Sequence, residues 1–264
     1  MQPIGFPGLG LEFNIDPVAF RAFGIPIYWY GIIISIGFMI AVILAHYEAR
    51  RVGLNSEVIL DVALYGTPSA IVGARLYYVL FNWSFYKNNI MEIFSIRHGG
   101  MAIYGAILAA LLSTVIYCKI NKVDLWKVCD IGALGLLIAQ AIGRWGNFVN
   151  QEAYGGPTRL PWRMEIFDID AQARISVHPT FLYESLWNLV GFLFLFWYRK
   201  RKKFDGEIFL LYGLWYGLGR FWIEGMRADS LYWGSFRISQ VVAFVSVFLC
   251  AGLLIYYRKN KKAY

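Results

Sequence analysis

The sequence predicts an all-α polytopic membrane protein, a bundle of seven transmembrane helices with a small extracytoplasmic loop subdomain. Two observations lead to this fold class. Of the 264 residues, 58% are hydrophobic and only 16% are charged, and the mean hydropathy is +0.49. A soluble chain of this length needs far more charged surface. In addition, apolar stretches of roughly 20 residues, the length that crosses a bilayer, recur along the whole chain.

The expected spans cover, in order, residues 27–46, 58–81, 99–118, 128–146, 179–198, 207–224 and 237–257. Most connections between them are short, as in a compact bundle, so we expect a single integral membrane domain over residues 1–264. Two longer segments are expected outside the membrane. Residues 1–26 form an N-terminal extracytoplasmic segment, and residues 147–178, with Pro157 and Pro161, form the loop subdomain.

Lysine and arginine residues indicate the orientation of the bundle, because cytoplasmic loops carry an excess of them. The basic residues that crowd one side are Arg50, Arg51, Lys119, Lys122, Lys127, Arg199 to Lys203, Arg258, Lys259, Lys261 and Lys262. That side is expected to be cytoplasmic, with the N-terminus outside and the C-terminus in the cytoplasm. The basic runs adjoin span ends, so the net charge of +8 indicates topology and contact with membrane lipids, and no nucleic-acid partner is expected.

Cysteine and glycine residues have structural explanations. The three cysteines, Cys118, Cys129 and Cys250, lie in or beside apolar segments and give neither a disulfide framework nor a metal-ligand spacing. The His, Asp and Glu residues also lack such a spacing, so no metal site is expected. Gly213 and Gly217 have the GxxxG spacing that favours close packing of one helix against another.

Costly polar residues fall at one level of the predicted bundle, in its outer half. They are Tyr30, Arg75, Tyr104, Arg144, His178, Glu184, Arg220 and Glu224. Charged side chains within spans are expensive and are functional candidates by default. Their common depth therefore predicts one site near the outer face.

The end of the fourth span has the richest pattern. Its residues Gly143-Arg144-Trp145-Gly146-Asn147-Phe148-Val149-Asn150-Gln151-Glu152 combine a guanidinium fork, two amides and glycines that let the backbone approach a ligand. These features suit an anion. Alternatively, the asparagines cap the helix and Arg144 extends to the membrane interface. Glu152 is either part of the site or a loop carboxylate paired with an arginine.

The fifth and sixth spans carry the remaining charges. Tyr216, Arg220, Glu224 and Arg227 are spaced 4, 4 and 3 apart and form one stripe on a helix. The stripe is either a salt-bridged seam between helices or a charged part of the site.

Glu184 and Asn188 share a face of the fifth span by i,i+4 spacing. Glu184 either orients Arg144 or Arg220 or acts in catalysis. His178 either caps its helix or joins the site.

These motifs resemble those of the prolipoprotein diacylglyceryl transferases of the bacterial inner membrane. Residues 143–152 are similar to the family signature G-R-x-G-N-F-x-N-x-E. Further matches are Trp29-Tyr30-Gly31, Gly73-Ala74-Arg75-Leu76, Gly99-Gly100-Met101, His178-Pro179-Thr180, Leu182-Tyr183-Glu184, and Tyr216-Gly217-Leu218-Gly219-Arg220 with Glu224, Arg227 and Asp229. The resemblance spans nearly the whole chain.

The resemblance implies an enzyme that acts in the first step of bacterial lipoprotein maturation. It would move the diacylglyceryl group of phosphatidylglycerol to the thiol of the lipobox cysteine in a prolipoprotein signal peptide and release glycerol-1-phosphate. Phosphatidylglycerol and the prolipoprotein would be its partners. The chain would lie in the cytoplasmic (inner) membrane with its site facing the outer side.

That chemistry requires stabilisation of a departing phosphate, for which arginine is well suited because it is permanently charged and bidentate. We expect Arg144 and Arg220 to flank the phosphodiester. The remaining expected contacts to substrate or to these arginines come from Tyr30, Arg75, Asn147, Asn150, Glu152, His178, Glu184, Tyr216, Glu224 and Arg227. No metal or organic cofactor is required.

Two positions depart from the family. Tyr104 stands where many members carry a histidine after the Gly-Gly-Met segment, and His98, which precedes the glycines, does not replace it. A phenol with a pKa near 10 is a poor base at neutral pH, so Tyr104, Glu152 and water all stay open as the thiol's base. Phe181 stands where members often have glutamine.

Two other function classes fit the sequence less well. A transporter or channel for an anionic lipid or a small anion would also gather polar residues at one depth. Transporters, however, tend to place their sites near the midplane between repeated halves, whereas this site is expected toward one face of a chain without repeats. A different phospholipid enzyme, such as a CDP-alcohol phosphotransferase, needs a dense aspartate motif for metals, which this sequence lacks.

Overall fold

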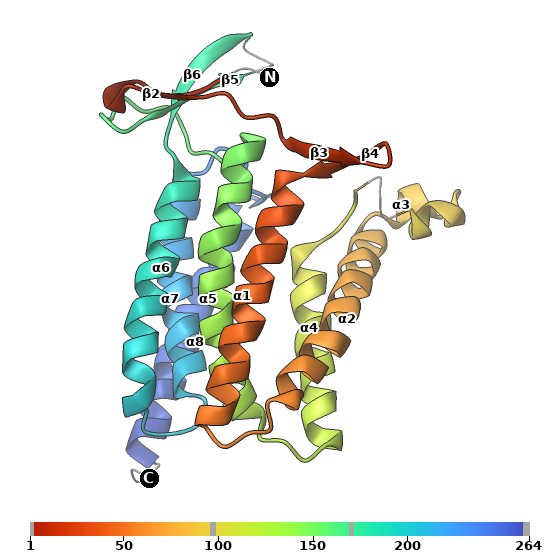
Figure 1. Cartoon of the computed structure of the whole chain (residues 1–264), viewed down its shortest axis with the longest axis vertical. Helices are drawn as coiled ribbons and strands as arrows, with labels where there is room; N and C mark the ends of the chain where they lie inside the picture. The colour runs from red at the N-terminus through yellow and green to blue at the C-terminus, as the bar shows by residue number, and fades with distance from the viewer. Residues whose placement is uncertain (1–2, 96–98, 169–171, 261–264) are drawn as a thin grey trace. The chain divides into compact units, whose positions relative to one another are not determined.

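The computed structural model describes residues 3–95, 99–168 and 172–260, so His98 lies outside the described residues. The chain is mostly helical, and a helix occurs at each of the seven predicted ranges (Figure 1). The long helices are α1 (Trp29–Arg51), α2 (Glu57–Phe81), α4 (Ile103–Ile120), α5 (Leu125–Asn150), α6 (Thr180–Tyr198), α7 (Glu207–Glu224) and α8 (Ile238–Asn260). Short helical turns are η1 (Pro7–Leu9), α3 (Trp83–Tyr86), η2 (Ile90–Phe94) and η4 (Arg199–Arg201).

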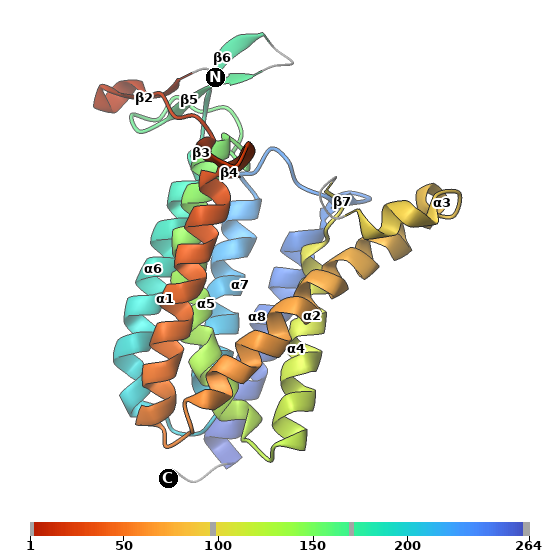
Figure 2. The same ribbon diagram turned by 45° about the vertical axis from the view of Figure 1, so that its right-hand side comes forward.

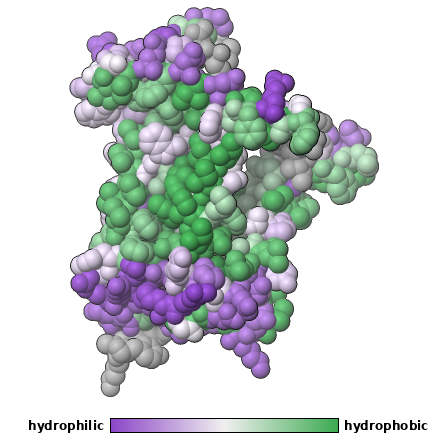
Figure 3. Space-filling view, viewed as in Figure 1, coloured by the Kyte–Doolittle hydropathy of each residue, from purple (hydrophilic) through white to green (hydrophobic). Residues whose placement is uncertain are grey.

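Within the described ranges, six helices are long and apolar enough to cross a membrane: α1, α2, α4, α5, α6 continued through Arg201, and α8. Helix α7, whose 18 residues include Glu207, Arg220 and Glu224, is not among them. On the face seen in Figure 3, the surface over the middle of α6, α5 and α1 is hydrophobic, and hydrophilic residues gather at the helix ends away from the sheet. The chain is therefore a polytopic membrane protein.

Short strands correct the predicted all-α class. Strands β1 (Ile4–Phe6), β2 (Leu11–Phe13), β5 (Met164–Asp168) and β6 (Ala173–Val177) form an antiparallel sheet in the order β2-β1-β5-β6. Gly5 pairs with Glu165, so the N-terminal segment and the loop after α5 share this sheet.

Two hairpins complete the strands of the described residues: β3 (Val18–Ala22) with β4 (Ile25–Tyr28), and β7 (Tyr232–Trp233) with β8 (Phe236–Arg237). Phe23 and Gly24 at the first hairpin's turn have positive φ, as two-residue hairpin turns require.

Contacts divide the chain into two compact units. The first unit comprises residues 1–44 and 129–264, and the second comprises residues 45–128. The expectation of one integral membrane domain stays a prediction.

In the first unit, the sheet packs on the end of α5 and the start of α6. The core there comprises Ile4, Phe6, Phe148, Val149, Met164, Ile166, Val177 and Phe181. Phe181 stacks on Phe148 with ring centroids 4.8 Å apart, so the Phe181 side chain belongs to this core. This packing fixes the two helix ends that carry Arg144 and Glu184.

Helix α7 packs closely on α8, as the GxxxG spacing predicts. A Cβ at Gly213 would lie 2.5 Å from Cys250 Sγ, and one at Gly217 would lie 2.8 Å from Val247 Cγ2. Only glycine allows this approach at both positions, so this prediction is confirmed.

In the second unit, α2 and α4 lie side by side (Figure 2). A Cβ at Gly73 would lie 2.6 Å from the Gly105 carbonyl oxygen. Backbone contact of this kind sets the pairing of the two helices.

Candidate active site

The centre of the site is an ion-pair cluster formed by α5, α6 and α7. Glu184 on α6 bridges two arginines, because its Oε1 lies 2.5 Å from Arg144 Nη2 and its Oε2 lies 3.4 Å from Arg220 Nη1. Arg220 Nη2 also lies 2.6 Å from Glu224 Oε2, one turn on in α7. The sequence predicted Arg144 or Arg220 as the partner of Glu184, and in the structure Glu184 contacts both.

Burial distinguishes the cations from the anions in this cluster. The side chains of Glu184 and Glu224 are 5% and 2% exposed, whereas those of Arg144 and Arg220 are 20% and 17% exposed. The carboxylates therefore lie behind the guanidinium groups. Two positive groups from different helices remain reachable by an anion.

Helix α5 ends in a turn that folds Glu152 back over its last residues. Gln151 and Ala153 have positive φ, and the Glu152 amide donates to the Asn147 carbonyl at 3.1 Å. Asn147 Nδ2 donates to Glu152 Oε1 at 2.8 Å, and Asn150 Nδ2 lies 3.4 Å from the same oxygen.

The side-chain amide of Asn147 also contacts the arginine cluster. Arg144 Nη1 donates to Asn147 Oδ1 at 3.3 Å. Asn147 therefore connects Arg144 to Glu152. The asparagines bind side chains of the site, which decides against the alternative that they serve only as helix caps.

Tyr30, at the start of α1, lies against the same end of α5. A Cβ at Gly146 would be 2.7 Å from Tyr30 Cδ2, so glycine is required for the ring to sit there. This contact brings Tyr30 to the helix turn between Arg144 and Asn147.

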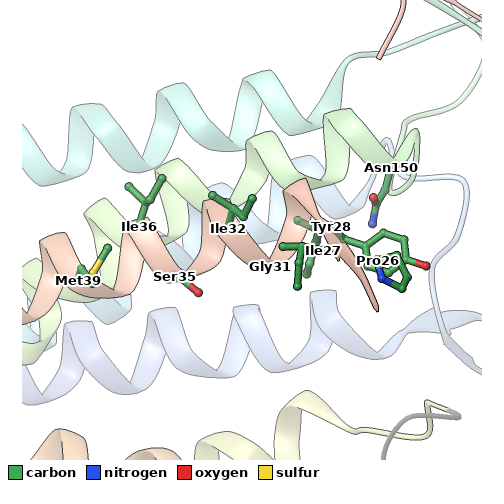
Figure 4. Close-up of a pocket in the computed structure, with 10 residues that line it drawn as sticks. Pro26, Ile27, Tyr28, Gly31, Ile32, Ser35, Ile36, Met39 and Asn150 are labelled. Carbon is green, nitrogen blue, oxygen red and sulfur yellow. The ribbon is translucent and has the colours of Figure 1, made fainter. Parts of the chain in front are cut away.

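An apolar groove runs from this point along α1. Tyr28 and Asn150 lie at one end, and Ile32, Ser35, Ile36 and Met39 continue along the helix (Figure 4). Tyr30 also lines the groove. Its volume is about 690 Å³. That volume lies within the range of small-ligand sites, and the lining suits a hydrocarbon chain.

His178 lies outside the arginine cluster. Its Nδ1 is 3.4 Å from the hydroxyl of Tyr183, which accepts a hydrogen bond from Trp162 Nε1 at 2.8 Å. Its backbone also exchanges hydrogen bonds with Gly155 and Gly156. The described contacts of His178 thus join the loop subdomain to α6.

Arg227 corrects the predicted helical stripe. Helix α7 ends at Glu224, and Arg227 lies beyond it. Its Nε and Nη2 donate to the two oxygens of Asp229 at 2.9 and 2.8 Å. The stripe therefore holds for Tyr216, Arg220 and Glu224 only. The Tyr216 ring stacks on Tyr212 with centroids 5.8 Å apart.

Arg75 and Tyr104 lie in the second unit. Every N–H of the Arg75 guanidinium donates to a backbone carbonyl, at Glu92, Ile93, Ser95, Gly99 and Gly100, over 2.5 to 3.2 Å. Arg75 thus binds the segment that precedes α4. Tyr104 is the second residue of α4. Substrate contact by either residue stays a prediction.

Sequence reasoning missed polar side chains one turn farther from the sheet than the arginines. Gln140 Nε2 donates to the Tyr212 hydroxyl at 3.0 Å between α5 and α7. Gln140 lies one turn before Arg144 inside an apolar run, and this spacing could have identified Gln140 as a polar residue on the same face of the helix. In the described part of the chain, no three His, Cys, Asp or Glu side chains gather as a metal site.

The chain is similar to known proteins over most of its length. The family model of prolipoprotein diacylglyceryl transferase matches residues 17–256. A phosphatidylglycerol–prolipoprotein diacylglyceryl transferase of Listeria innocua is 48% identical over 250 residues, covering 92% of this chain and 90% of its own. The enzymes of that name from Clostridioides difficile and Enterococcus faecalis are 43% and 45% identical, covering 94% of this chain and 97% and 92% of their own. The chain therefore belongs to the prolipoprotein diacylglyceryl transferase family.

Proposed function

We propose that the chain transfers the diacylglyceryl group of phosphatidylglycerol to the lipobox cysteine in the signal peptide of a prolipoprotein, the first step of lipoprotein maturation. The observation that carries this proposal is the pair of guanidinium groups on α5 and α7 held by one carboxylate, Glu184. Such a pair suits one phosphate, because arginine binds phosphate oxygens in a bidentate manner.

The reaction requires a nucleophile and a stabilised leaving group. The cysteine sulfur, as a thiolate, attacks the glyceryl carbon that bears the phosphate ester. A carbon–sulfur bond forms, the carbon–oxygen bond breaks, and glycerol-1-phosphate leaves with the electron pair. The thiol proton passes to a base. Arg144 and Arg220 stabilise the charge that grows on the departing phosphate, and each can lower the barrier by about 3 kcal/mol in a water-poor site.

The ion pairs indicate how the lipid enters the cluster. Two arginines face Glu184 and Glu224, so the cluster is close to neutral before the lipid binds. The Arg220–Glu184 contact of 3.4 Å is the longest of the three, and a phosphodiester oxygen replaces it most easily. Arg144 keeps its 2.5 Å contact and stays oriented.

The outer residues complete the lipid site. Tyr30 and Asn147 orient the head group beside Arg144, and Asn150 and Glu152 hold Asn147. The apolar groove along α1 takes an acyl chain, because its lining is mostly apolar and Tyr28 and Asn150 lie at one end (Figure 4). Tyr216 and Arg227 support the α7 side of the site, and His178 supports the loop above it.

The thiol proton has three candidate acceptors, Tyr104, Glu152 and water. Tyr104 occupies the position of the family histidine. Glu152 is a carboxylate beside the arginine cluster, bound by Asn147 and Asn150. Substitution of Tyr104 and of Glu152 distinguishes the two side chains from water as the acceptor.

The membrane arrangement follows from the same function. Helix α7 is the seventh span, because its charged residues lie at its two ends, Glu207 at the first and Arg220 and Glu224 at the last, and residues 208–219 between them carry no charge. The N-terminus and the sheet lie outside and the C-terminus lies in the cytoplasm of the inner membrane, where a secreted prolipoprotein meets the site.

The direct test uses the purified chain with phosphatidylglycerol and a peptide that carries a lipobox cysteine. We expect glycerol phosphate to appear together with a diacylglyceryl thioether on the peptide. A peptide with serine in place of the cysteine is the control. Release from the serine peptide, or none from the cysteine peptide, would contradict the proposal.

A further inference from the structure

Asn188 on α6 is a buried polar side chain that has no role in the proposed mechanism. Its side chain is fully buried at 0% exposure, and among the described residues both amide atoms, Nδ2 and Oδ1, are without a hydrogen-bond partner. Gln140 Oε1 on α5 is also buried and has no partner within the described part of the chain. A buried amide left unpaired is costly, and native proteins keep few such groups without a function.

The level of Asn188 follows from contacts on either side. Ser185 Oγ donates to the Ala141 carbonyl at 2.8 Å, which pairs this turn of α6 with the Gln140 turn of α5. Trp187 and Trp215 each donate an indole N–H to the other's carbonyl at 3.0 Å, which fixes α6 against α7.

Helix geometry then relates Asn188 to the arginine cluster. Asn188 follows Glu184 by one turn, a rise of about 6 Å, and points to the same side of α6. Gln140 precedes Arg144 by one turn on α5 and donates to Tyr212 of α7. The amides of Asn188 and Gln140 and the Tyr212 hydroxyl therefore lie at similar heights in the bundle, about one helical turn from the arginine cluster on the side away from the sheet.

From this geometry we infer that Asn188 and Gln140 bind the hydroxyl groups of the phosphatidylglycerol head group and so select glycerol over other lipid head groups. The inference rests on the proposed function. With the phosphate on Arg144 and Arg220, the head-group glycerol carries hydroxyls on the second and third carbons beyond the phosphate ester oxygen. Each hydroxyl donates one hydrogen bond and accepts others. The two free atoms of Asn188 offer one donor and one acceptor, and Gln140 Oε1 offers a second acceptor.

The alternative location for the hydroxyls is the outer group of Asn147, Asn150 and Glu152. There the amides already donate to Glu152. The amides of Asn188 and Gln140, by contrast, have unsatisfied atoms that favour a ligand with hydroxyl groups.

The test compares two lipids that differ only in head-group hydroxyls, phosphatidylglycerol and phosphatidylpropanol with the same acyl chains. Transfer to the cysteine peptide is measured for the wild-type chain and for Asn188→Leu and Gln140→Leu. We expect a wild-type preference for phosphatidylglycerol that falls about tenfold or more in each variant, because one lost hydrogen bond has about that effect. The rate with phosphatidylpropanol should change little.

Folding and a matched control make the result specific. Ser185→Ala removes a hydrogen bond at the same level of α6 and should keep the preference. Asn188→Leu should unfold at the same or a higher temperature than wild type, because an apolar residue of similar size relieves the unpaired amide. A Tm that falls while the preference persists would overturn the inference and assign Asn188 to helix packing through bound water.

Other outcomes separate the two proposals. Equal preference in wild type and both variants overturns the assignment of the hydroxyls while the transferase function stands. No transfer from either lipid by the wild-type chain overturns both.

Discussion

Glu184 Oε1 lies 2.5 Å from Arg144 Nη2 and connects α6 to α5 at the base of the site. The other oxygen of Glu184 faces Arg220, so one buried carboxylate positions both cations. Removal of its charge should therefore affect two phosphate contacts at once.

Glu184→Gln tests this role. The amide keeps the size of the side chain but cannot hold two guanidinium groups by charge. We expect transfer to slow about 100-fold, the effect of misplacing catalytic groups by roughly 1 Å. Glu184→Asp keeps the charge and should recover part of the rate. Steady-state kinetics with phosphatidylglycerol measure both, and a glutamine variant with wild-type rate would exclude the positioning role.

Arg144→Ala and Arg220→Ala should each reduce transfer at least 100-fold, because each removes a donor to the departing phosphate. Arg174→Ala is the matched control, since Arg174 also pairs with a glutamate, Glu12, at 3.0 Å on the exposed sheet. An exposed pair contributes little, so this control should keep its rate. Near-normal turnover in a folded Arg144 or Arg220 variant would remove that arginine from the mechanism.

Tyr104→Phe and Glu152→Gln identify the proton acceptor. A variant without its base should be slow at pH 7 and recover at higher pH, because a free thiol ionises by itself with a pKa of about 8.5. Such recovery in Tyr104→Phe or in Glu152→Gln would identify that residue as the acceptor. A rate reduced by the same factor at every pH indicates positioning, and an unchanged rate and pH profile excludes the Tyr104 hydroxyl.

The sequence predicted the helices well because long apolar runs dominate this fold. The sheet was missed because β1 and β2 have three residues each and Gly5 pairs with Glu165, far away in the chain. Strands this short have no alternation that could be recognised.

The arginine cluster was also predictable, because intramembrane charges require partners. Arg227 was misplaced because α7 ends at Glu224, three residues earlier than the spacing implied. The contact of Glu152 with the asparagines depends on positive φ at Gln151 and Ala153, and neither residue type signals that conformation.

The Arg227–Asp229 pair should make the segment after α7 sensitive to acid. Burial raises the pKa of Asp229, but the hydrogen bonds and charge of Arg227 outweigh this, and the pKa lies below its ordinary value. A lowered carboxyl pKa stabilises the fold above the unfolded pKa of about 3.9 and ceases to do so as the pH falls through the folded value.

Hydrogen exchange at Ala228, whose amide donates to the Tyr154 carbonyl at 3.2 Å, measures this effect. After correction for the intrinsic rate, protection should be constant down to about pH 4 and fall below it. Asp229→Asn should exchange faster already at pH 7 and show no further acid-dependent loss. Equal protection in both proteins would contradict the role of the pair.

Asp130 should stabilise the end of the bundle away from the sheet. Its carboxylate accepts hydrogen bonds from the backbone amides of Gly206 and Phe209 at 3.0 and 2.9 Å and lies 2.8 Å from Lys202 Nζ. Asp130→Ala leaves the two amides and the ammonium without this partner. We expect a lower Tm in detergent, because breaking a buried ion pair costs about 3–5 kcal/mol. Transfer per folded molecule should not change, whereas an unchanged Tm would exclude the structural role.

Alanine substitutions at two glycines one turn apart on α5, Gly143 and Gly146, distinguish the packing of Tyr30 from general effects of substitution. A Cβ at Gly146 would lie 2.7 Å from Tyr30 Cδ2, whereas one at Gly143 would meet Ile34 Cδ1 at an ordinary 3.7 Å. Alanine favours a helix over glycine by about 1 kcal/mol, so neither substitution should weaken α5 itself.

We therefore expect Gly146→Ala to displace the Tyr30 ring and slow transfer about 100-fold. Gly143→Ala should stay within about threefold of wild type, since a surface-like change costs under 0.5 kcal/mol. Equal rates in the two variants would mean that the position of Tyr30 does not matter for the reaction.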